Sequence, residues 1–477
     1  MSHLLPRHAT HAFASLLPRE REGLVVVGRR SVLKASIAGL AGISLPGLLK
    51  RQAGAAEPDA AGAAPGAPLV APPPRGKSVI LLWMTGGPSH IDTWDVKPLM
   101  PVEIRGPFGV IDTALPGVQI CEHLPKQAAM LDQMTLIRSV DAQFSNHEPN
   151  QVFQTANLAA EPRINPEAPK YPAIGALASK ILGPRDPALP PYVVLNMQDR
   201  SHIAWGGYLG QQFDPFDGRR IDNIVRLPTG IVHERLTSRR DLRQQLDRLR
   251  RDLDRGGMMN ALDRFEQQAV DLVAGQRARE AFDVGREPPH TLLRYGDHPW
   301  CRQALLARRL VEAGVAFVTI DLSNHTSSGT WDNHGDNIPP YGGISKGLKP
   351  LLPVFDHLIT TLVADLTERG LIDDVLVLAM GEFGRTPQVG TQESTDGRNH
   401  WPPVMSMTVA GGGLRHGQVI GASDRMGGEI KERPVTPGDL AATIYRHLGV
   451  PLDASYLDFR GRPRPIIEQG SPIGELG

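Results

Sequence analysis

The stretch VILLWMTGGP at residues 79–88 joins a continuous apolar run to a glycine-rich turn. A short run that is apolar at every position is typical of a strand covered on both faces, as in a parallel sheet. Gly86-Gly87-Pro88 ends this strand, and polar residues follow it. The stretch therefore predicts an α/β domain whose functional groups gather at the carboxyl ends of its strands.

Similar apolar runs recur along the chain, and helical patterns separate several of them. The expected strands are residues 135–140, 192–195, 315–322, 375–380 and 405–410. The expected helices are residues 302–313, 351–369 and 437–448, each followed by a glycine. This order predicts a three-layer α/β sandwich with a mainly parallel central sheet over residues 77–470. A charged segment at about 238–283 is expected to be an inserted helical hairpin, its charges forming either a solvated face or, less simply, an interaction surface.

The sequence pattern of the first 76 residues predicts that the protein is exported from the cytoplasm. Arg29-Arg30 precede an apolar run at 35–49, the layout of a twin-arginine signal, so residues 1–52 are expected to be a signal region. The competing interpretation is an ordinary buried helix. Residues 53–76 are mostly Ala, Gly and Pro and are expected to be a linker. We therefore expect the protein in the periplasm or cell envelope, with no stable membrane span after signal removal.

Composition excludes several classes of protein. The chain has 477 residues with 51 Lys+Arg against 51 Asp+Glu, so no overall positive field attracts nucleic acid or acidic lipid, and any such partner must be recognised by a local site. Cys121 and Cys301 are the two cysteines, which excludes a disulfide scaffold and leaves either one bridge or two buried thiols. A redox role has little support, because neither a haem-attachment motif nor a nucleotide glycine fingerprint occurs. The oligomeric state stays open.

Polar residues that bind metals well follow two of the later strands. Asp332, His334 and Asp336 alternate, so an extended backbone projects them to one side as ligands for a divalent metal; a polar turn is the alternative. Glu382 and Arg385 follow the strand at 375–380 as either a metal ligand beside an anion clamp or a structural ion pair. Because such segments meet at one edge of a parallel sheet, the set predicts metal-assisted hydrolysis.

The motifs together resemble a known family. They are GGPSHIDTWDVKP at 86–98, LARRLVEAGV at 306–315, WDNHGD at 331–336, GEFGRTP at 381–387 and GRNHW at 397–401. In this order, over about 77–465, they resemble the bacterial domain-of-unknown-function family 1501. That family is similar in fold to the alkaline phosphatase and sulfatase superfamily. The resemblance implies an alkaline phosphatase-like fold, a divalent metal and hydrolysis of phosphate or sulfate esters.

The resemblance also implies roles for particular residues. The positions that correspond to metal ligands of the superfamily are Asp332, His334, Glu382 and His400; for a second metal, Thr85 stands where an aspartate is expected, and Asp92 is the nearest carboxylate. The nucleophile is expected near Ser145 and His147, either of which would attack or assist. The formylglycine pattern Cys/Ser-x-Pro-x-Arg is absent, which disfavours a conventional sulfatase.

Two hypotheses follow. The first is an exported metal-dependent hydrolase that holds zinc, manganese or calcium and acts on an anionic ester or a sulfated or phosphorylated polymer, with Arg385 neutralising the substrate anion. The second is a non-catalytic exported binding protein on a degenerate alkaline phosphatase-like scaffold. Thr85 and the altered nucleophile segment favour the second hypothesis, since fold alone does not fix function.

Overall fold

The structure is a computed structural model. It describes residues 76–142, 145, 151–161, 165–196, 205–218, 276–324, 330–335, 337, 342–391 and 393–477. Outside these residues lie the predicted signal region, nearly all of the linker, most of the predicted hairpin at 238–283, and both His147 and Asp336.

The central sheet is mixed and mainly parallel, as predicted. In the described residues it has eight strands in the order β12-β4-β11-β8-β1-β7-β5-β6. Every neighbouring pair is parallel except the two that β11 makes with β4 and β8. The strands are β1 Ser78–Trp83, β4 Met134–Val140, β5 Tyr192–Leu195, β6 Phe216–Asp217, β7 Phe317–Asp321, β8 Val375–Met380, β11 Met405–Gly411 and β12 Gln418–Ile420.

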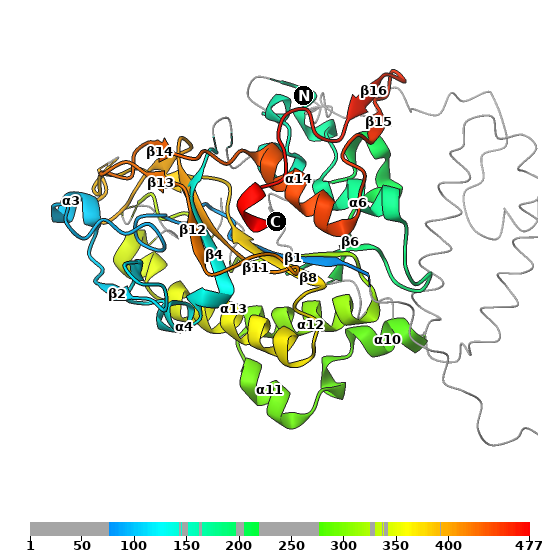
Figure 1. Cartoon of the computed structure of the whole chain (residues 1–477), viewed down its shortest axis with the longest axis horizontal. Helices are drawn as coiled ribbons and strands as arrows, with labels where there is room; N and C mark the ends of the chain where they lie inside the picture. Colours follow the sequence, from blue (N-terminus) through cyan, green and yellow to red (C-terminus); the bar gives the residue numbers. More distant parts are fainter. Residues whose placement is uncertain are drawn as a thin grey trace, which may run out of the picture. The chain divides into compact units, whose positions relative to one another are not determined.

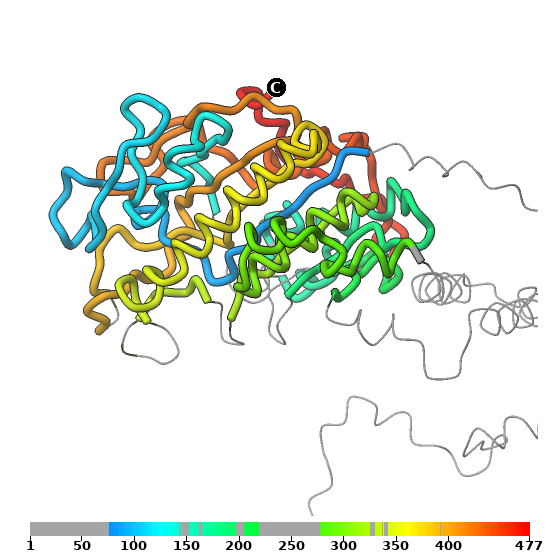
Figure 2. The backbone as a smooth tube through the Cα atoms, turned by 90° about the horizontal axis from the view of Figure 1, so that it is seen from below, coloured from blue at the N-terminus to red at the C-terminus, as the bar shows by residue number. Residues whose placement is uncertain are grey.

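Helices cover both faces of this sheet (Figure 1). On one face α12 (Pro299–Ala313) and α13 (Leu351–Glu368) run side by side, as Figure 2 also shows. On the other face lie α6 (Ile174–Leu182) and α14 (Pro437–Leu448). Side chains of β1 alternate between the two layers: Ile80 and Leu82 join the core on the α12–α13 side, and Val79 and Leu81 join the core on the α6–α14 side. This alternation explains why the run is apolar at every position.

The remaining elements are short. The helices are α3 Val102–Arg105, α4 Pro125–Ala129, α5 Gln151–Thr155, α10 Gln276–Phe282 and α11 Pro289–Tyr295. The paired strands outside the main sheet are β2 Val110–Asp112 with β3 Gln119–Cys121, β9 Gly384–Arg385 with β10 His400–Trp401, β13 Ala422–Ser423 with β14 Ile430–Glu432, and β15 Ser455–Leu457 with β16 Pro463–Pro465.

The two cysteines are buried free thiols, the simpler of the two expectations. Burial raises the pKa of Cys121 to about 12 and that of Cys301 to about 11, so both stay protonated at neutral pH. Among the described residues, no helix is both long and apolar enough to cross a membrane.

Candidate metal centre

The glycines after β1 let two distant loops approach the end of that strand. Gly86 has φ +116° and Gly87 has φ +77°, a backbone region that side chains disfavour. A Cβ on Gly86 would lie 2.3 Å from the Asp332 backbone nitrogen, and one on Gly87 would lie 2.7 Å from the Phe383 carbonyl oxygen. The loops that follow β7 and β8 therefore meet at the carboxyl end of β1, as the sequence predicted.

Three of the predicted ligands gather there. The Asp332 Oδ1 atom lies 2.5 Å from His334 Nδ1 and 3.6 Å from His400 Nε2. The ligand atoms of the three residues all lie within 4.8 Å of one another. His400 reaches this point because β10 pairs with β9, which sets His400 opposite Arg385. The Asp332 side chain is fully buried, whereas those of His334 and His400 are 16% and 37% exposed, so the cluster is accessible from the histidine side.

Arg385 holds the carboxylate of Asp332 from the protein side. Its Nη2 lies 2.8 Å from Asp332 Oδ1, and neither side chain is exposed. Its other donors go to backbone carbonyls: Nε donates to Gly87, Nη2 to Gly86 and Nη1 to Arg398. The guanidinium therefore joins the β1 turn to the GRNHW loop, and its ion pair is with Asp332, whereas the structural pair considered from the sequence was with Glu382. A role toward a substrate anion stays a prediction.

Glu382 and Asp92 take other positions. Glu382 is buried, and its Oε1 accepts the Gly86 N–H at 2.8 Å. Asp92 forms a two-point pair with Arg398, with Nε 2.6 Å from Oδ2 and Nη2 3.2 Å from Oδ1, and it accepts the Ser89 hydroxyl at 2.5 Å. Neither carboxylate belongs to the three-residue cluster found in the described part of the chain. Metal binding by either residue stays a prediction, and Asp92 already has a cation for a partner.

Of the two candidate nucleophiles, one lies within the described residues. Ser145 is 1% exposed, and its buried Oγ has no hydrogen-bond partner among the residues that the structure describes. An unsatisfied buried hydroxyl costs free energy unless a water or ligand bonds it, so a nucleophilic role for Ser145 stays a prediction. His147 lies outside the described residues.

Two further buried groups lie at this sheet edge that the motifs did not predict. Arg398 belongs to GRNHW, but nothing in the motif showed that it would neutralise Asp92 from 306 positions away. Asp321 ends β7 and accepts the Thr85 hydroxyl at 2.5 Å, both residues being buried. A lone carboxylate within the apolar run 315–322 was the signal for Asp321.

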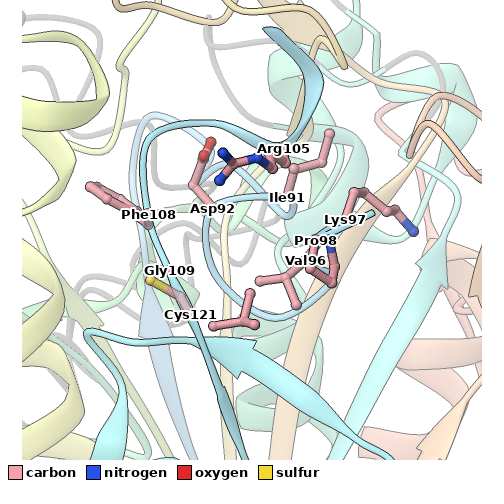
Figure 3. A pocket seen from close by; sticks show the side chains of 10 residues that line it. Ile91, Asp92, Val96, Lys97, Pro98, Arg105, Phe108, Gly109 and Cys121 are labelled. Atoms are coloured by element: carbon pink, nitrogen blue, oxygen red, sulfur yellow. The ribbon is translucent and has the colours of Figure 1, made fainter. Parts of the chain in front are cut away.

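A pocket of about 120 Å³ lies beside Asp92 (Figure 3). Its lining includes Lys97, Arg105, Phe108 and Cys121. Because Asp92 is paired with Arg398 and the Cys121 thiol stays protonated, the pocket offers neither a free carboxylate nor a nucleophile.

One carboxylate and two imidazoles form a donor set typical of catalytic divalent metal sites, which keep coordination positions open for water or substrate. Together the fold and this cluster define a mixed-sheet, three-layer α/β protein with metal-binding potential at the carboxyl edge of its sheet.

The chain belongs to the family described as Protein of unknown function (DUF1501), whose model matches residues 76–476. This confirms the family predicted from the motifs. A search of curated proteins found no match.

Solved structures with a related arrangement include a sulfatase from Pseudoalteromonas sp., at 14% identity and TM-score 0.35, covering 79% of this chain and 68% of that one. Another is a phosphonate monoester hydrolase from Silicibacter pomeroyi, at 12% identity and TM-score 0.34, covering 84% and 78%. A third is the phosphonate monoester hydrolase of Agrobacterium radiobacter, at 13% identity and TM-score 0.32, covering 83% and 78%. At this level of similarity, none of them transfers an activity to this chain.

Proposed function

We propose that the protein is an exported metal-dependent hydrolase of phosphate or sulfate esters, with Asp332, His334 and His400 as ligands of one divalent metal. The observation that carries the proposal is the convergence of their ligand atoms within 4.8 Å at the carboxyl edge of the sheet. Export by the twin-arginine route rests on the sequence pattern of residues 1–52.

The donor set favours zinc or manganese over calcium. Calcium prefers about six to eight oxygen ligands, whereas two of these three groups are imidazoles. When bound, such a metal would act as a Lewis acid on an ester oxygen.

Other residues around the metal would have separate roles in binding and catalysis. Arg385 fixes the carboxylate of Asp332 in position before any ligand arrives, since it also bonds the Gly86 and Gly87 carbonyls. The part-exposed His400 lies on the accessible side of the cluster. Ser145, whose buried hydroxyl has no hydrogen-bond partner in the described part of the chain, is the proposed nucleophile, with His147 as its alternative or assistant.

Elemental analysis of protein purified without chelator tests the metal site. Wild type and a His334→Ala, His400→Ala double variant are compared, because these part-exposed histidines are removed at less risk to folding than Asp332, whose loss would leave Arg385 unpaired. His290→Ala, an exposed histidine on α11, is the matched control. Near-stoichiometric zinc or manganese in wild type and control, lost in the double variant, is the expected result.

Turnover separates the two candidate functions. The metal-loaded protein is screened with aryl phosphate and aryl sulfate esters, and activity that falls with the double variant is expected. One observation favours the alternative of a non-catalytic binding protein. The guanidinium of Arg385 already donates to carbonyls of the protein and pairs with Asp332, so it is not directed at a substrate. Stoichiometric metal without ester turnover would support that alternative, and no metal in a folded wild type would reject the site altogether.

A further inference from the structure

The hairpin β15–β16 presents large apolar side chains to solvent at its tip. Its register pairs Ser455 with Pro465 and Leu457 with Pro463. Along the first strand and into the turn, Tyr456 and Asp458 are 4% and 6% exposed. The alternate residues Leu457 and Phe459 are 57% and 66% exposed. Leu457 and Phe459 therefore expose apolar surface within two residues of each other, which makes the tip a candidate contact surface.

The hairpin is rich in arginine. Residues 455–465 contain Arg460, Arg462 and Arg464 against a single acid, Asp458. Asp458 is satisfied within the hairpin, since it pairs with the Arg462 and Arg464 side chains at 2.7 and 3.4 Å and accepts the backbone N–H groups of Arg460 and Arg462. Residues 455–465 therefore carry two more positive than negative charges, and the neighbouring Lys170 is paired with Glu167 at 3.1 Å.

The tip is held in place from beneath. Phe459 packs edge-on against Tyr208 with ring centroids 5.0 Å apart, and the Lys170 ammonium lies 5.9 Å from the Phe459 ring centre. The Arg464 guanidinium lies over Tyr171 and Tyr208, at 5.5 and 5.7 Å. Because these contacts hold Phe459 and Arg464 in advance, binding through these two side chains would cost little conformational entropy.

We propose that this hairpin tip docks the protein onto an anionic lipid surface, with Leu457 and Phe459 entering the headgroup boundary and the arginines contacting lipid phosphates. A projecting tip with two apolar side chains is small for a stable protein interface, which buries roughly 800 Å² on each partner. Apolar side chains flanked by basic ones are instead the pattern of peripheral membrane contacts. The hairpin lies at the margin of the domain, beyond α6 (Figure 1). This proposal is independent of the metal site.

Vesicle co-sedimentation of the full chain tests the proposal. Vesicles of phosphatidylcholine with phosphatidylglycerol are compared with vesicles of phosphatidylcholine alone. The expected result is binding to the anionic vesicles that falls at high salt and at least about tenfold in a Leu457→Ser, Phe459→Ser variant. Arg460→Gln is expected to weaken binding about fivefold.

Control variants test whether vesicle binding depends on the hairpin tip and not on exposed apolar side chains in general. Leu293→Ser removes an apolar side chain that is 81% exposed on α11, and it is expected to leave binding unchanged. The apolar run at residues 35–49 is identical in all variants, so it cannot produce a difference between them. Unchanged thermal unfolding shows that the variants fold.

Two results would overturn the proposal. One is equal vesicle binding by wild type and the Leu457→Ser, Phe459→Ser variant. The other is wild-type binding to soluble dextran sulfate but not to vesicles, which would assign the arginines to an anionic polymer.

Discussion

Two buried arginine–aspartate pairs lie at the same edge of the sheet and differ in what else surrounds the carboxylate. Arg398 and Asp92 are both fully buried, and Asp92 also accepts the Ser89 hydroxyl, so this pair is closed. Arg385 and Asp332 are equally buried, but two part-exposed histidines lie against Asp332, so this pair is open. A buried ion pair by itself indicates structure, whereas a buried pair with accessible imidazoles beside it indicates a binding site.

Breaking the closed pair should have the largest effect on stability. Arg398→Met leaves the Asp92 charge buried without its cation, and we expect a loss of about 3–5 kcal/mol in the free energy of unfolding, measured by urea denaturation. Adding Asp92→Asn should restore a substantial part of this loss. If Arg398→Met costs less than about 1 kcal/mol, the closed pair is not a structural element.

The second-largest loss of stability is expected from a substitution in the glycine turn that lies between the two pairs. Gly86→Ala places a Cβ against the Asp332 backbone at φ +116°, and we expect a loss of about 2–3 kcal/mol together with weaker metal binding. Gly183 also has a positive φ, +67°, but open space around it, so Gly183→Ala should cost only about 1 kcal/mol. Equal losses in the two variants would show that the approach of Asp332 is unimportant.

The loss of folding stability at acid pH also bears on the comparison, because it is easily assigned to His334 and His400 when another histidine causes it. Burial lowers the pKa of His447, whose Nε2–H donates to the Ser78 carbonyl at 2.9 Å. The folded state therefore binds fewer protons than the unfolded state, in which the pKa is about 6.5. Stability from His447 is complete above about pH 6.5 and declines below it, by at most about 1.4 kcal/mol per pH unit. His447→Gln should flatten this slope in denaturation curves, and an unchanged slope would point to other histidines.

Removing the more exposed of the two histidines beside the open pair should have the smallest effect on stability. His400→Gln is expected to change the free energy of unfolding by less than about 0.5 kcal/mol, since the side chain is 37% exposed. The same variant should lower metal affinity about 10- to 100-fold, measured by competition with a chelating dye. Unaltered affinity would exclude His400 as a ligand and leave the open pair without its accessible imidazole.

Much of the fold was predictable because strands covered on both faces and glycine-terminated helices leave strong local signals. The predicted runs at 192–195 and 375–380 match β5 and β8 residue for residue, and that at 437–448 matches α14. The run at 315–322 became β7 Phe317–Asp321, because Val315 and Ala316 precede the pairing with β1. The reversed direction of β11 was not predictable, since an apolar run has the same composition in either direction.

The sequence by itself determined the family, the α/β class and the residue types at the sheet edge, because these depend on local pattern and motif order. Only the tertiary structure decided which charges meet. Asp92 and Asp332 are both aspartates within short motifs, and the sequence does not distinguish them. In the structure Asp92 pairs with Arg398, 306 positions away, whereas Asp332 has two histidines beside it. Such partnerships depend on distances of a few ångströms between loops that only folding brings together.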